Sequence, residues 1–303
     1  MGNARWNPSD WKNYTRSNTT GRSRAAVFSR STIREDFDPR RIQVRESRDS
    51  GANPASNAVI VAFDETGSMG AIPDAFVREG LGVMVSEILD RKPVTDPHVM
   101  IMGFGDAWCD RAPLQATQFE PDIRIAEQLK DIYLEGGGGG NGYESYNLPW
   151  YFAAQKTSID CFEKRGKKGY LFTVGDEPPP PVLLASHVRQ VFGDSIERDL
   201  DSRDVLAMAE RIYEVFHIVI EEGSFYRSRP ELVKEQWREL LDERVIFLSD
   251  YRRLAETIVS TMEINEGRDS RAVTESWSND IALVVANAVC GLPRPTDAKS
   301  VRF

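Results

Sequence analysis

The apolar positions of this 303-residue chain follow two different patterns. Through residues 1–57 they keep neither the helical nor the strand period, and the segment ends in a turn-like Ser-Gly-Ala-Asn-Pro run. From residue 58 onward, short β-branched runs alternate with amphipathic stretches, which is typical of strands and helices that share one mostly parallel sheet. We therefore predict an irregular N-terminal arm over residues 1–57, an α/β domain over 58–264 and a C-terminal extension over 265–303.

The same alternation predicts the individual elements around a central sheet flanked by helices. Strands are expected at 58–63, 98–104, 115–119, 169–174, 215–220 and 245–248. Helices are expected at 75–89, 123–134, 143–157, 204–213, 231–241 and 251–262. Pro149 should interrupt or kink the third of these helices, and the four prolines at 178–181 exclude a helix directly after the preceding strand. In the extension, 281–288 should form a strand or a short helix.

Oxygen-bearing side chains follow two of the predicted strands directly. Asp64, Thr66 and Ser68 come after the first strand, and Asp176 comes after the strand at 169–174. In parallel α/β sheets, ligands bind beyond the carboxyl ends of the strands, and Mg²⁺ prefers oxygen ligands. A turn that caps the next helix would explain one of these hydroxyls but not the whole set. The pattern therefore favours a magnesium site.

The five residues from Asp64 to Ser68, Asp-Glu-Thr-Gly-Ser, resemble the metal ion-dependent adhesion site (MIDAS) of the von Willebrand factor A (vWA) family, of the intracellular bacterial or phage type. The family has Asp-x-Ser-x-Ser after its first strand, and the order of elements over 56–262 also fits. The resemblance implies a Rossmann-like vWA fold and a bound Mg²⁺, with Mn²⁺ or Ca²⁺ as other candidates. It implies that Thr66 and Ser68 coordinate the ion directly, that Asp64 acts through hydrogen bonds and water, and that Asp176 is the family's later aspartate.

The chain departs from the family at the second motif. There the family places a Thr on a glycine-rich loop before a helix, whereas this chain has five glycines at 136–140 and no Thr in the residues that follow. Asn141, Glu144 or Ser145 could supply an oxygen in its place, and the sequence does not choose among them. The other interpretation is a flexible surface loop without a role in metal binding.

The resemblance implies binding rather than catalysis. An ion with an open coordination position would accept a carboxylate from a protein partner, and the implied partner is a MoxR-type AAA+ ATPase or another macromolecular assembly, for which the chain would serve as an adaptor.

Two other functions stay open on sequence grounds. The segment from Asp64 to Ser68 also resembles the Asp-Lys-Thr-Gly-Thr loop of haloacid-dehalogenase-type phosphotransferases, in which Asp64 would be the nucleophile. Against this, the acid-base Asp usual two residues after that nucleophile is absent, and Glu65 replaces the lysine. The third hypothesis is a structural assembly protein whose metal site has decayed, because the second-motif Thr is missing.

Charge adds information about the arm. Residues 1–57 hold 11 Arg or Lys against 6 Asp or Glu, a net charge of +5, so the remainder carries −14 of the total of −9. Opposite signs suggest that the arm lies against an acidic surface, its own or a partner's, and a solvated tail is the alternative. Nucleic acid binding is not favoured, because the basic residues are dispersed among acids and the body is acidic.

The distribution of apolar residues also bears on the cellular compartment in which we expect the protein. The first residues lack the apolar core of a secretory signal, and the longest apolar run, 281–290, is too short to span a bilayer. We therefore expect a cytoplasmic protein with no membrane contact. Cys109, Cys161 and Cys290 are widely spaced and odd in number, which indicates free thiols rather than disulfides.

Overall fold

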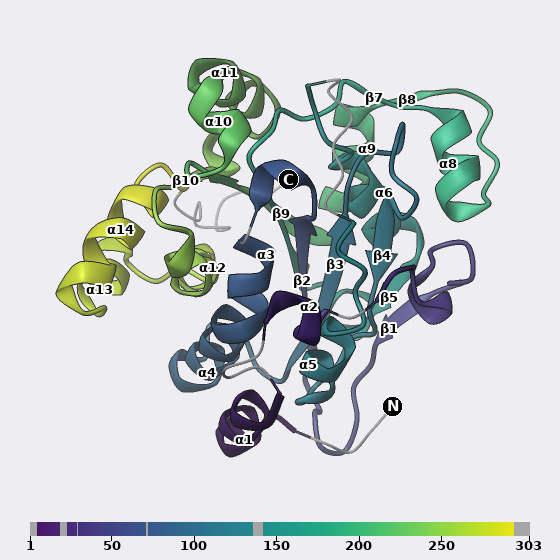
Figure 1. Ribbon diagram of the computed structural model, residues 1–303. Helices are drawn as coiled ribbons and strands as arrows, with labels where there is room; N and C mark the ends of the chain where they lie inside the picture. The colour runs from purple at the N-terminus through teal and green to yellow at the C-terminus, as the bar shows by residue number, and fades with distance from the viewer. Residues whose placement is uncertain (1–4, 19–22, 29, 71, 136–141, 294–303) are drawn as a thin grey trace, which may run out of the picture.

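The computed structural model describes residues 5–18, 23–28, 30–70, 72–135 and 142–293. Its centre is a six-stranded sheet in the order β10-β9-β6-β2-β3-β4, in which β4 alone is antiparallel to its neighbour (Figure 1). These strands are β2 (Asn57–Asp64), β3 (Pro97–Phe104), β4 (Leu114–Ala116), β6 (Gly169–Gly175), β9 (Tyr213–Ile220) and β10 (Val245–Leu248). The predicted fold class, a mostly parallel Rossmann-like sheet flanked by helices, is confirmed.

Helices cover both faces of this sheet, and this explains why its strands are mostly apolar along their whole length. Along β2, Ile60 packs with the cluster that includes α6, α9 and α11, whereas its neighbour Val61 packs with the cluster that includes α4 and α12. All eight residues of β2 are buried. The helices of these two layers are α4 (Leu81–Arg91), α6 (Asn147–Gln155), α9 (Ser202–Glu210), α11 (Pro230–Leu241) and α12 (Leu254–Asn265).

Further helices and two small sheets complete the described part of the chain. The remaining helices are α1 (Pro8–Asn18), α2 (Arg24–Val27), α3 (Ile72–Ala75), α5 (Arg124–Leu129), α7 (Asp160–Arg165), α8 (Ala185–Phe192), α10 (Ser224–Ser228), α13 (Ser270–Glu275) and α14 (Asn279–Val289). Two small sheets pair β1 (Arg45–Ser47) with β5 (Thr157–Ile159) and β7 (Val182–Leu183) with β8 (Leu200–Asp201).

Several predicted helices have different bounds. The helix predicted at 75–89 is divided into α3, a π-helical turn at Phe76–Gly80 and α4, and the helix predicted at 123–134 is only α5. Pro149 does not interrupt its helix, because α6 begins at Asn147 and places Pro149 in the first turn, where a missing N–H breaks no intrahelical bond. The segment predicted at 281–288 is helical, within α14.

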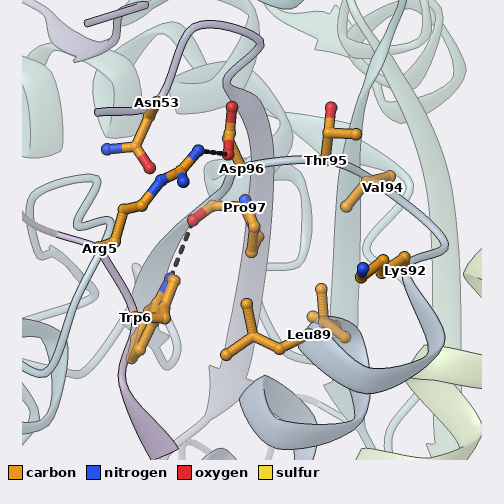
Figure 2. Close-up of a pocket in the computed structure, with 10 residues that line it drawn as sticks. Arg5, Trp6, Asn53, Leu89, Lys92, Val94, Thr95, Asp96 and Pro97 are labelled. Carbon is orange, nitrogen blue, oxygen red and sulfur yellow. Dashed lines mark hydrogen bonds and ion pairs between the residues drawn. The ribbon is translucent and has the colours of Figure 1, made fainter. Parts of the chain in front are cut away.

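The prediction of an irregular N-terminal arm was wrong in part, because the arm contains α1 and the strand β1, which pairs with β5. Contacts with distant residues hold it. The Trp6 indole N–H donates to the carbonyl of Pro97 at 2.9 Å, beside a cavity of about 390 Å³ that Figure 2 shows. The Tyr14 hydroxyl donates to the carbonyl of Ala126 at 2.7 Å. Single aromatic anchors of this kind leave no periodic pattern in the sequence.

The positive charge of the arm meets acids of the chain's own domain. Arg5 forms an ion pair with Asp96 at 3.0 Å, as Figure 2 shows. Arg34 pairs with Asp131 at 2.5 Å. The described part of the arm therefore lies against the domain itself rather than forming a solvated tail.

The C-terminal extension packs against α12. The indole N–H of Trp277 donates to the Ser260 hydroxyl at 2.8 Å, and the guanidinium of Arg91 lies 3.5 Å from the Trp277 ring centre. The helix α14 also contacts β10, the strand at one edge of the sheet, and so protects it. Within the described ranges, no helix combines the length and apolar character needed to cross a membrane.

Candidate metal-binding site

The predicted oxygen ligands lie beside the two central strands, β2 and β6, at the point where the order in which strands are added to the sheet changes sides. From β2 the chain first adds β3 on one side, and it later returns to add β6 on the other side of β2. The connections after β2 and β6 therefore diverge at the carboxyl ends of these strands, which is where ligands bind in open α/β sheets. Asp64 is the last residue of β2, and Asp176 directly follows β6. Because Phe63 pairs with Val174, Asp64 lies beside Gly175, and Asp176 follows one residue further along the neighbouring chain segment.

Hydrogen bonds connect the four residues predicted after the strands at 58–63 and 169–174. Asp64 Oδ1 accepts from the Thr66 backbone N–H at 2.8 Å and from its hydroxyl at 2.6 Å. The hydroxyls of Thr66 and Ser68 share a hydrogen bond of 3.1 Å, and Ser68 donates to Asp176 Oδ1 at 2.6 Å. The other oxygen of Asp176 accepts from the Phe225 N–H at 2.9 Å. The structure therefore brings Asp64, Thr66, Ser68 and Asp176 together.

The local backbone explains how these side chains come to face one another. Thr66 is extended, and a single 3-10 turn then runs from Gly67 to Met69. Met69 is buried and fixes this turn to the core below. Gly70 has φ +54°, a left-handed conformation that favours glycine. The chain can therefore turn sharply after Ser68 and begin α3 at Ile72.

Two buried carboxylate oxygens in this region have no hydrogen-bond partner: Asp64 Oδ2 and Glu144 Oε2. Asp64 is 0% exposed and Glu144 is 2% exposed, so solvent does not satisfy them. Burial, and next the charge of Asp176, raises the pKa of Asp64 well above its usual range. Burial, and next the charge of Asp64, raises the pKa of Glu144 to about 11. Both ionised forms therefore lack a compensating positive charge, which a bound cation would supply.

The second-motif candidates differ in their surroundings. Asn141 lies outside the described residues. Ser145 is tied to the loop after β3, because its hydroxyl accepts from the Ala107 N–H at 3.0 Å and its own N–H donates to the Gly105 carbonyl at 3.2 Å. Glu144 instead has a carboxylate oxygen without any partner. Of the two described candidates, Glu144 is therefore the one with an unused buried oxygen.

Two further acids of the site escaped the sequence analysis. Glu177 follows Asp176, and burial, then the charges of Asp176 and Asp106, raises its pKa to about 7. Asp106 follows β3, is fully buried and accepts from the Trp108 N–H at 3.0 Å. Its position two residues after β3 was a signal for a site residue, but the same position suits an aspartate that stabilises a turn. Only the burial of Asp106, which the structure shows, distinguishes a site residue from an aspartate that stabilises an exposed turn.

Aromatic residues hold the loop after β6 in place. The Glu177 N–H donates to the Tyr146 hydroxyl at 3.2 Å, and the Trp237 indole N–H donates to the Glu177 carbonyl at 2.8 Å. Gly175 is needed for this packing, because a Cβ atom there would come within 2.1 Å of the Tyr146 hydroxyl oxygen. A buried aromatic cluster therefore helps to fix the loop that carries Asp176.

The chemistry of these residues fits a hard cation only if the hydroxyls take part. Among the described residues, no three His, Cys, Asp or Glu side chains are grouped so as to hold a metal ion. Mg²⁺, Mn²⁺ and Ca²⁺ accept hydroxyl, carboxylate and water oxygens. Thr66 and Ser68 would therefore have to coordinate such an ion beside the carboxylates of Asp64 and Asp176.

No family model matches this chain, and no curated protein sequence matches it. Among solved structures, the pilus adhesin SpaC from Lactobacillus rhamnosus GG in its open conformation is similar over 73% of this chain and 31% of its own, with a TM-score of 0.46 and 10% identity. Proximal thread matrix protein 1 of the mussel byssus is similar over 69% and 48%, with a TM-score of 0.43 and 12% identity. A von Willebrand factor type A protein from Catenulispora acidiphila is similar over 71% and 44%, with a TM-score of 0.36 and 14% identity. The chain thus spans less than half of each of these structures, and similarities this weak do not define its family.

Proposed function

We propose that this chain is a non-enzymatic, Mg²⁺-dependent protein interaction module of the vWA type. One observation carries the proposal: the buried Asp64 Oδ2 has no partner, at the point where Thr66, Ser68 and Asp176 meet beyond the strand ends. An unsatisfied buried carboxylate oxygen is costly unless a ligand completes its surroundings. Mn²⁺ and Ca²⁺ have the same preference for oxygen and are the other candidates.

In this proposal Thr66 and Ser68 coordinate the ion directly, while Asp64 and Asp176 orient their hydroxyls and compensate its charge. The hydrogen bonds from Thr66 to Asp64 and from Ser68 to Asp176 already fix the orientation of both hydroxyl groups, and with it the direction of their lone pairs. The ion supplies an electrophilic centre that an oxygen of a partner can complete. The chain itself supplies positioning and exclusion of water.

Calorimetric titration with Mg²⁺ tests the proposal on the wild-type chain and on Ser68→Ala. We expect saturable binding to the wild type and a loss of at least about tenfold in affinity in the variant, the lower end of what even a supporting group contributes to a metal site. Ser50→Ala is the matched control, because its hydroxyl accepts one backbone hydrogen bond in a turn outside this site. Circular dichroism checks that each variant is folded. Wild-type protein that binds no divalent ion would refute the proposal.

Two other functions predict different results. As a haloacid-dehalogenase-type phosphotransferase, the chain would form an aspartyl phosphate on Asp64 when incubated with acetyl phosphate and Mg²⁺, and mass spectrometry would detect the added phosphoryl group. A structural protein with a decayed site would bind its partner equally well with Mg²⁺ and with EDTA.

The partner proposed from the vWA resemblance is a MoxR-type AAA+ ATPase, with the chain as its adaptor. Surface plasmon resonance with a purified ATPase of this type, in Mg²⁺ and in EDTA, measures the interaction. We expect binding that EDTA and Asp64→Ala both abolish. Binding that survives both treatments would place the contact elsewhere on the chain.

A further inference from the structure

A cavity of about 390 Å³ lies between the N-terminal arm and the end of α4 (Figure 2). Pro97, the first residue of β3, lines it, whereas Asp64 lies beside Phe104, the last residue of the same strand. The cavity and the proposed metal site are therefore at opposite ends of the parallel strands. A volume of this size is within the range of about 300–1,000 Å³ that is usual for small-molecule sites.

One wall of this cavity is apolar. It is formed by Trp6, Ile88, Leu89, Val94 and Pro97 (Figure 2). The Trp6 indole is held in place, because its N–H donates to the Pro97 carbonyl at 2.9 Å and the neighbouring Arg5 pairs with Asp96 at 3.0 Å. An aromatic ring of fixed orientation favours a flat apolar group that stacks on it or meets it edge to face. The wall therefore fits the ring of an aromatic ligand.

The charged residues that line the cavity are Arg5, Lys92 and Asp96. Two of them compensate each other, because Asp96 Oδ1 lies 3.0 Å from Arg5 Nη2. The other oxygen of Asp96 accepts from the Ala55 N–H at 3.0 Å. The ammonium of Lys92, which Figure 2 shows across the cavity from Arg5, is then the remaining charge of the lining. A ligand with one negative charge would complement it.

The backbone is unusual at two of these charged residues. Lys92 has φ +53° and Asp96 has φ +37°, and they are two of the three non-glycine residues with positive φ in the described ranges. Aspartate tolerates this conformation better than most residues, but lysine rarely adopts it. Lys92 ends α4, where its N–H donates to the Ile88 carbonyl at 2.9 Å and a glycine would be usual. Backbone conformations of this kind cluster at ligand-binding sites.

We propose that this cavity binds a small aromatic monocarboxylate. Its ring lies against Trp6 and Leu89, and its carboxylate faces the ammonium of Lys92. An uncharged aromatic ligand gains only the contact with the apolar wall, and a cationic one is repelled by Lys92. The ligand reaches neither Asp64 nor the ion proposed there, because these lie at the other ends of the strands.

The ligand class is tested with 1-naphthoate and its uncharged analogue 1-naphthylmethanol, titrated into the full chain and followed by saturation-transfer NMR. The titrations are made in EDTA, so that the carboxylate cannot bind through a divalent ion at the other site. We expect 1-naphthoate to bind about fivefold more tightly, the upper end of what a solvent-exposed ion pair contributes. Equal or tighter binding of the alcohol, or binding of neither probe, would overturn the proposal.

The location is tested with three variants whose folding is checked by circular dichroism. Lys92→Gln should lose about fivefold in affinity for 1-naphthoate and nothing for the alcohol. Leu89→Ala should lose about tenfold for both probes, because it removes part of the apolar wall. Lys234→Gln is the matched control, because Lys234 pairs with Glu231 on α11 and does not line the cavity.

Unchanged 1-naphthoate affinity in Lys92→Gln, or a loss of equal size in Lys234→Gln, would show that the probe does not bind beside Lys92 and would overturn the proposal. If Leu89→Ala fails to fold, the comparison of the two lysine variants decides. The result is independent of the proposed metal site, because EDTA is present throughout. A chain that binds 1-naphthoate but no divalent ion refutes only the proposed function, and a chain that binds Mg²⁺ but neither probe refutes only this inference.

Discussion

The buried histidine His98 should make this protein less stable in mild acid. His98 lies on β3, is 3% exposed, and its Nδ1 shares a hydrogen bond of 3.1 Å with the Ser47 hydroxyl. Its Nε2 is buried without a partner. Burial lowers the pKa of His98 from 6.5 to about 4, although Asp96 and Asp49 act in the opposite direction. The folded protein therefore holds this ring neutral at pH values where the unfolded chain would protonate it.

The sign and size of the effect follow from proton linkage. Because the unfolded state binds the additional proton, the contribution of His98 to folding is fully present above its unfolded pKa of 6.5 and is lost as the pH falls toward about 4. One pKa unit corresponds to about 1.4 kcal/mol. Between about pH 7 and about pH 5, the shift therefore removes about 2 kcal/mol from the free energy of unfolding.

Urea unfolding, monitored by tryptophan fluorescence, measures the free energy of unfolding at both pH values in the wild type and in His98→Gln. Glutamine has no titration in this range, so the variant should lose about 2 kcal/mol less than the wild type between the two pH values. Taking the difference between the proteins cancels the titration of the carboxylates, which both share. The same pH dependence in both proteins would show that folding does not lower the pKa of His98 and would refute the reasoning.

Three further results are expected. Asp64→Ala should keep its far-UV circular dichroism spectrum and lose any stabilisation by Mg²⁺. In EDTA its melting temperature should stay close to that of the wild type, because the relief of the partnerless Oδ2 offsets the loss of the two hydrogen bonds that Oδ1 accepts from Thr66; a large drop in melting temperature would contradict this. Trp11→Ala should lower the free energy of unfolding in urea by about 2 kcal/mol, because this half-buried indole packs against the backbone of α4 and anchors α1. An unchanged free energy of unfolding would mean that α1 does not contribute to stability. A maleimide should label the exposed Cys290 first and the buried Cys161 last. Cys109 should react after Cys290, because burial, and then the charge of Asp110, raises its pKa to about 12. Peptide mapping that shows Cys109 labelled first would refute the order.

The sequence by itself determined the features that depend on short stretches of chain. The strand β2 was predictable because a parallel strand covered on both faces must be apolar along its whole length. The grouping of Asp64, Thr66 and Ser68 was predictable because these residues lie within five positions directly after that strand. Asp176 followed from the rule that strand ends meet at one edge of a parallel sheet.

Only the tertiary structure decided the features that depend on contacts between distant residues. The helix α1 forms in a segment without helical periodicity, because Tyr14 finds its partner at Ala126, far along the chain. The different surroundings of Glu144 and Ser145 depend on a hydrogen bond from Ala107 to Ser145 that no local pattern encodes. Local sequence fixes which backbone conformations and side chains are available, whereas burial and unsatisfied hydrogen-bonding atoms arise only when separate segments exclude water together.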